Sequence, residues 1–68
     1  AEAWCARGNT LVILERYEEA LDCYDRVLAA NPDDPGALKG KAMALIYIDR
    51  PAEAARYYER LQRLPGRS

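Results

Sequence analysis

Apolar residues recur every three or four positions along this chain, and the pattern starts anew four times. Such spacing is typical of amphipathic helices that bury one face. It predicts four helices, with bounds near Glu2 to Leu14, Tyr17 to Ala30, Pro35 to Ile48 and Pro51 to Leu64. The connections between them are only two to four residues long. Successive helices should therefore run antiparallel.

Start and stop signals support these bounds. Asn31 precedes Pro32, and the residue before a proline is pushed out of the α region, which ends the second helix. Asp34 is a good N-cap for the third helix, and Pro35 suits its first position. Gly8 lies inside the first helix, where it costs about 1 kcal/mol relative to alanine. Such a glycine suggests that another helix approaches closely.

The two halves of the chain repeat one plan. At a shift of 34 positions, seven pairs are identical: Ala3/Ala37, Leu11/Leu45, Arg16/Arg50, Glu19/Glu53, Ala20/Ala54, Tyr24/Tyr58 and Arg26/Arg60. A fixed period of about this length is typical of a solenoid built from helix–turn–helix units.

The first unit carries Trp4, Gly8, Leu11, Ala20, Tyr24, Val27 and Pro32, and the second carries Leu38, Ala42, Leu45, Ala54, Tyr58 and Leu61. In these residues the chain resembles the tetratricopeptide repeat family. Arg7 and Lys41 depart from the usual leucine, and the late proline of the second unit comes one place early, at Pro65. The resemblance implies an all-α fold, a short right-handed α-solenoid. Its two antiparallel helix–turn–helix hairpins, residues 1–34 and 35–68, would form a single domain.

Two such units bury only one interface between them, so the fold should be marginally stable. Arrays of this family generally end in a polar helix that seals the last repeat, and none follows Leu64. The chain begins with Ala1, and its only methionine is Met43. We therefore expect a fragment of a longer array, or an oligomer that associates through an apolar face of the last helix, formed by Tyr57, Tyr58, Leu61 and Leu64.

The composition is that of a small globular domain, with half of the 68 residues apolar and 31% charged. It contains no apolar run long enough for a membrane helix and no secretory signal, so we expect a cytoplasmic protein with no membrane partner. The net charge of −1 hides an asymmetry. Residues 1–34 hold eight acids and three bases, a net −5, whereas residues 35–68 hold three acids and seven bases, a net +4. The asymmetry is either surface variation or a pair of complementary ends that favour head-to-tail stacking.

The sequence contains few residues suited to catalysis or to binding a metal or cofactor. The chain has no histidine, and its two cysteines, Cys5 and Cys23, form no CxxC pair. We therefore expect free thiols, no metal site, no cofactor and no enzymatic activity. The acidic pairs Glu18/Glu19 and Asp33/Asp34 fall at helix starts and in a turn, where helix dipoles and capping account for them.

The resemblance instead implies a peptide-binding groove lined by the first helix of each unit. By position, its residues are Glu2, Cys5, Asn9, Val12 and Ile13, with Gly36, Lys39, Gly40, Met43, Ile46 and Tyr47. Helical spacing places positions 5, 9, 12 and 13, and likewise 39, 43, 46 and 47, on one face. The Asn9 side chain could form hydrogen bonds with an extended peptide backbone, and Lys39 could pair with a carboxylate. Met43, Ile46 and Tyr47 would form an apolar surface beside them. The alternative is that Val12, Ile46 and Tyr47 only pack against adjacent helices.

Two more specific partners fit poorly. Family members that clamp a peptide carboxylate use Lys and Asn where this chain has Cys5 and Gly40. A basic ridge of Arg56, Arg60, Arg63 and Arg67 follows the fourth helix, but Glu53 and Glu59 interrupt it and the sequence pI is about 5.3, which argues against nucleic acid. The sequence therefore predicts a protein or peptide partner, with self-association as the alternative.

Overall fold

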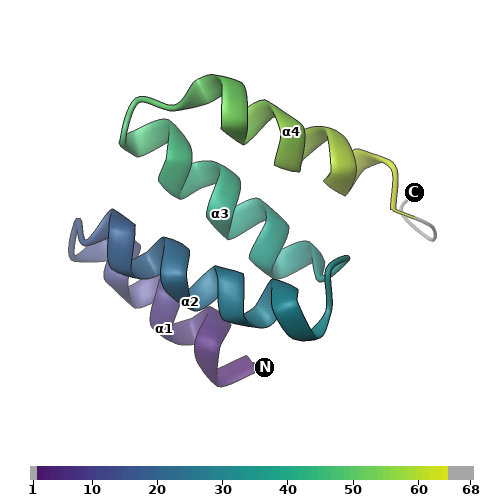
Figure 1. Ribbon diagram of the computed structural model, residues 1–68. Coiled ribbons are helices and arrows are strands. Elements are labelled where there is room, and N and C mark those ends of the chain that lie inside the picture. The colour runs from purple at the N-terminus through teal and green to yellow at the C-terminus, as the bar shows by residue number, and fades with distance from the viewer. Residues whose placement is uncertain (1, 65–68) are drawn as a thin grey trace.

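The computed structural model of this chain describes residues 2–64 and contains four helices (Figure 1). They are α1 (Glu2–Ile13), α2 (Tyr17–Ala30), α3 (Pro35–Tyr47) and α4 (Pro51–Gln62). Each packs against the next, and α1 also packs against α3. The described residues contain no strand, so the all-α prediction is confirmed. None of the described helices is long and apolar enough to cross a bilayer.

All four helices begin where the sequence predicted, but α1, α3 and α4 end one or two residues early. At the end of α1, the Arg16 amide donates to the carbonyl of Leu11 at 2.8 Å, and Glu15 adopts a left-handed φ of 63°. This is a Schellman-type stop. The end of α3 repeats it 34 positions later, with Asp49 at φ 64°. Pro65, the late proline of the second unit, lies outside the described residues.

Replacing Glu15 by glycine is expected to stabilise the fold. A left-handed conformation costs an ordinary L residue about 1–2 kcal/mol, and glycine adopts it freely. Part of that gain is lost to the greater freedom of glycine in the unfolded chain, so we expect a net gain of about 1 kcal/mol in the free energy of unfolding. The measurement is urea unfolding followed by circular dichroism. Glu18→Gly, inside α2, is the matched control and should lose about 1 kcal/mol; equal losses in both variants would contradict this account.

The predicted cap of α3 is confirmed. The Ala37 amide donates to Asp34 Oδ1 at 3.0 Å, and Pro35 occupies the first turn. This bond satisfies one of the amides that have no partner inside the helix. It also fixes the direction in which α3 leaves the α2–α3 connection, and so helps to align α3 beside α1.

The core consists of two clusters of buried residues. The first consists of Ala20, Tyr24, Val27 and Ala37, and the second of Ala42, Leu45 and Ala54. Tyr24 is 1% exposed and its ring fills the space between α1 and α3. A Cβ added to Gly8 would lie 2.8 Å from Cε1 of Tyr24, which confirms the close approach predicted there. A Cβ on Gly40 would overlap the same ring from the other side, a role for Gly40 that the sequence analysis did not identify.

The last helix is less open than expected. Leu61 is buried within the chain, and Tyr57 and Tyr58 are half-buried because they pack against the second core cluster, to which both α3 and α4 contribute. Leu64, just beyond α4, is half-buried as well. Leu61 is therefore already covered within its own chain. Self-association through the remaining residues stays a prediction.

Candidate functional site

The side of the molecule formed by α1 and α3 contains a hollow of about 210 Å³. Because α1 and α3 are both antiparallel to α2, they run in the same direction, and their C-terminal ends lie at the same end of the molecule (Figure 1). The hollow is lined by Asn9, Val12, Ile13, Tyr24, Gly40 and Met43. The structure thus brings together five of the predicted groove residues and adds Tyr24 from α2, whose ring borders the hollow.

Asn9 is already engaged inside the chain. Its Oδ1 accepts a hydrogen bond from the hydroxyl of Tyr24. Burial, followed by the nearby Cys5 and Cys23, raises the pKa of Tyr24, so the hydroxyl keeps the proton that it donates. The side-chain carbonyl is therefore less available to a ligand than the sequence analysis assumed. The side-chain nitrogen of Asn9, Nδ2, has no hydrogen-bond partner among the described residues and remains a donor.

One end of this side is unusually apolar. Ile13 is 79% exposed, Ile46 47% and Tyr47 54%, and Leu14 beside them is exposed as well. The Tyr47 ring stacks on Tyr17 with a centroid distance of 5.0 Å. The role of Tyr17 was not predicted, since the two tyrosines are 30 positions apart in the sequence and belong to different units. We call Ile13, Leu14, Ile46 and Tyr47 the apolar end. Exposed apolar residues that cluster in this way mark interaction surfaces.

The other residues of the predicted groove differ in their burial and in whether they line the hollow. Val12 is half-buried against the first core cluster, as the alternative interpretation expected. Cys5 packs against the same cluster, and its Sγ would lie 3.9 Å from a Cβ on Gly36. Lys39 is exposed on α3 and does not line the hollow. The side chain of Glu2 lies outside the described part of the chain.

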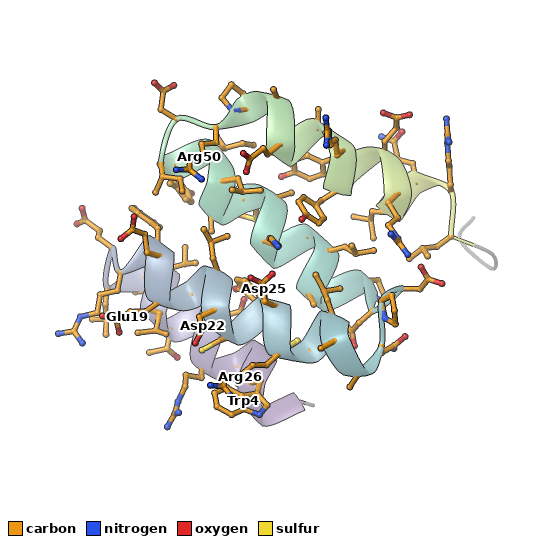
Figure 2. The ribbon with its side chains drawn as sticks, viewed as in Figure 1. Trp4, Glu19, Asp22, Asp25, Arg26 and Arg50 are labelled. Atoms are coloured by element: carbon orange, nitrogen blue, oxygen red, sulfur yellow. The ribbon has the colours of Figure 1, made fainter. Side chains whose placement is uncertain are left out.

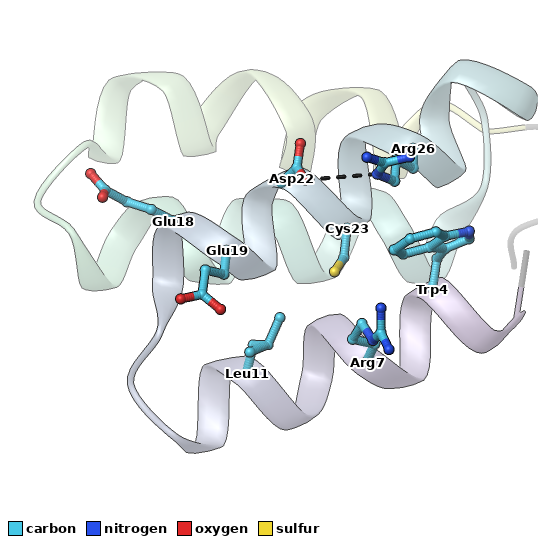
Figure 3. Close-up of a pocket in the computed structure, with 8 residues that line it drawn as sticks. All are labelled: Trp4, Arg7, Leu11, Glu18, Glu19, Asp22, Cys23 and Arg26. Carbon is cyan, nitrogen blue, oxygen red and sulfur yellow. Dashed lines mark ion pairs between the residues drawn. The ribbon is translucent and has the colours of Figure 1, made fainter.

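A second and larger hollow, of about 580 Å³, lies on α1 and α2, and the sequence analysis did not predict it (Figure 3). Its walls include Trp4, Arg7, Leu11 and Cys23, and the acids Glu18, Glu19 and Asp22 line it too. The Trp4 ring has two guanidinium groups over it, Arg7 at 5.4 Å and Arg26 at 4.7 Å from its centroid. Arg26 also pairs with Asp22 at 3.7 Å. This hollow has both aromatic and charged walls.

A charged contact joins the two units. Lys41 on α3 forms an ion pair with Asp25 on α2, and its ammonium lies 4.7 Å from the centroid of Tyr57 on α4. Figure 2 shows Asp25 on the side of α2 that faces α3. Burial alone would lower the pKa of Lys41, but the hydrogen bond to Asp25, the charge of that carboxylate and the nearby Tyr57 hydroxyl outweigh burial and raise this pKa. A departure from the family pattern thus has a structural role between the repeats.

The described residues offer hydrophobic contact, hydrogen-bond donation and charge pairing. Within residues 2–64, no group of three or more His, Cys, Asp or Glu side chains could hold a metal ion together. Cys5 and Cys23 are both thiols. The groups able to make these contacts lie at the two hollows and the apolar end.

Comparison with known proteins identifies a family and a curated relative. The sequence profile described as "Tetratricopeptide repeat" matches residues 1–34, half of the chain. Cellulose synthase operon protein C of Pseudomonas fluorescens (strain SBW25) is 40% identical over 47 residues. These residues make up 69% of this chain but only 4% of that protein, so the chain spans a small part of this relative. No solved structure matches.

Proposed function

The chain belongs to the tetratricopeptide repeat family, and on that premise we propose that it is a protein-interaction module that binds a partner peptide along the α1–α3 side. Repeats of this family typically serve as non-enzymatic interaction modules, and we propose the same for this chain. The observation that carries the proposal is the hollow of about 210 Å³ at Asn9, Ile13 and Met43, next to the exposed Ile46 and Tyr47. The partner binds as an extended segment or as one face of a helix.

The chemistry of these residues describes the ligand. An apolar side chain of the peptide fills the hollow, and a second one rests on the apolar end, where burial contributes about 25 cal/mol per Å² of apolar surface. The Asn9 amide nitrogen donates to a backbone carbonyl of the ligand. Lys39, exposed and one turn before Met43, pairs with a carboxylate at the rim, where such a pair affects specificity and association rate more than affinity.

The test begins with peptides selected from a random display library on this chain. We expect the variant Ile46→Ser with Tyr47→Ser to bind these peptides about tenfold more weakly or worse, since two anchoring surfaces are lost. Isothermal titration calorimetry measures the change. Gln62→Ser, at an exposed position on α4, is the control and should bind as the unaltered chain does. Equal affinities for the double variant and the control would refute binding at the apolar end.

A further inference from the structure

The packing of α2 on α3 shows how one repeat of this chain receives the next. Tyr24 of α2 lies against Gly40, and Asp25 pairs with Lys41. Leu21 packs against the cluster that contains Ala42 and Leu45. Leu21, Tyr24 and Asp25, which we call the donor row of α2, thus contact a line of residues on α3, which we call the acceptor row.

The equivalent row on α1 is only partly covered. Leu38 and Leu45 are buried on α3, whereas Trp4 and Leu11, which occupy the same places 34 positions earlier, are only half-buried. Arg7 takes the place of Lys41, but it is exposed where Lys41 is half-buried. These α1 residues line the hollow of about 580 Å³. Among the described helices only α2 and α3 pack against α1, so no further helix lies on this row.

The equivalent donor row lies on α4. Tyr58 and Glu59 stand 34 positions after Tyr24 and Asp25. Tyr24 is buried between two helices, whereas Tyr58 is half-buried because, of the described helices, only α3 packs against α4. Glu59 is exposed and pairs only with Arg63 on its own helix, at 3.1 Å, in the described part of the chain.

We propose that α4 of one copy docks on α1 of a second copy, in the register in which α2 packs on α3. Glu59 of the first copy then pairs with Arg7 of the second, as Asp25 pairs with Lys41. The charges of the two rows are opposite at this position, which fixes the register and disfavours others. Because donor and acceptor rows differ, the contact is heterologous, and further copies can add end to end. This contact leaves the α1–α3 side open and is independent of the groove proposal.

Two residues that differ between the units affect the strength of the contact. Cys23 stands where the second unit has Tyr57 beside Lys41, so the smaller side chain leaves room beside Arg7 for the incoming helix. Ala6 stands where Gly40 is, and its methyl group keeps the Tyr58 ring farther from α1 than Tyr24 is from α3. We therefore expect association between copies to be weaker than the packing of α2 on α3.

The experiment is sedimentation equilibrium of the 68-residue chain over a wide concentration series, with charge-reversal variants. Arg7→Glu alone and Glu59→Arg alone should each weaken association about tenfold, and the double variant should restore it. Both residues are exposed, and far-UV circular dichroism checks that the fold is kept. Arg16→Glu matches the charge change of Arg7→Glu at the α1–α2 turn and should leave association unchanged.

The proposal expects a molar mass that keeps rising above 7.7 kDa as the concentration increases. A mass of 7.7 kDa throughout would overturn it and leave the α1 row to a different partner. A mass that levels off at two copies would also overturn it, because it indicates a closed contact. A double variant that associates no better than the single ones would exclude the pair of Glu59 and Arg7.

Discussion

Replacing Tyr24 by alanine is expected to unfold most of the molecules at room temperature. The ring is the largest side chain that is fully buried, and it lies between Gly8 on α1 and Gly40 on α3. Removing a buried aromatic ring costs about 3–5 kcal/mol. A hydrophobic core of this size rarely supplies more than about 3–5 kcal/mol in total. One substitution therefore removes most of the stability.

Urea unfolding followed by far-UV circular dichroism measures this effect. Tyr24→Phe keeps the ring and removes only the hydrogen bond to Asn9, so it should cost about 0.5–1.5 kcal/mol. Tyr47→Ala removes a tyrosine that is half exposed and should leave a cooperative transition. A Tyr24→Ala chain that unfolds at the same urea concentration as the unaltered chain would show that this ring does not hold α1, α2 and α3 together.

Replacing Gly40 by alanine is expected to destabilise the fold by about 1–3 kcal/mol, the usual cost of an added methyl group in a packed core. The substitution favours the helix by about 1 kcal/mol, so intrinsic propensity predicts the opposite sign. The new Cβ would overlap the Tyr24 ring, which cannot retreat because Gly8 lies against its other side. Tyr58, the equivalent tyrosine of the second unit, is not enclosed in this way. It lies on α4 with α3 as its only packing helix in the described residues, and the position equivalent to Gly8 is alanine, Ala42.

The matched control is Gly36→Ala, on the first turn of the same helix. An added Cβ there would meet Asp34 Oδ1 at 3.3 Å and Cys5 Sγ at 3.9 Å, and both belong to side chains that can shift slightly. We expect a change within about 0.5 kcal/mol, as for most surface substitutions. Thermal unfolding by calorimetry distinguishes the two variants. A Gly40→Ala chain that melts at a higher temperature than the unaltered chain would refute the close packing at the Tyr24 ring.

Much of the fold could be predicted because its signals are local. The spacing of apolar residues predicted four helices, and Asp34 followed by Pro35 predicted the cap that the structure contains. The 34-residue period is reproduced even in backbone detail, since Glu15 and Asp49 share the same left-handed φ. The helix ends were predicted less well, because the stop at Glu15 uses a residue type that does not signal it.

The site was only partly predictable, because its contacts join residues far apart in the sequence. The helical face shared by Asn9 and Val12 followed from periodicity, but the bond between Asn9 and Tyr24 depends on how α1 and α2 are rotated against each other. The stacking of Tyr17 on Tyr47 depends on the packing of α2 beside α3. Lys41 was recognised as a departure from the family pattern, yet its partner Asp25 could not be inferred from the sequence alone.

The most direct test of peptide binding along the α1–α3 side is a map of the bound surface in solution. Nitrogen-15 NMR spectra of the labelled chain would be recorded while a selected peptide is added. We expect the backbone amide signals of Asn9, Ile13, Met43, Ile46 and Tyr47 to shift together, and those of α4 to stay in place. Shifts confined to α4, or to the hollow around Trp4 and Arg7, would contradict it and place the peptide on another face of the molecule.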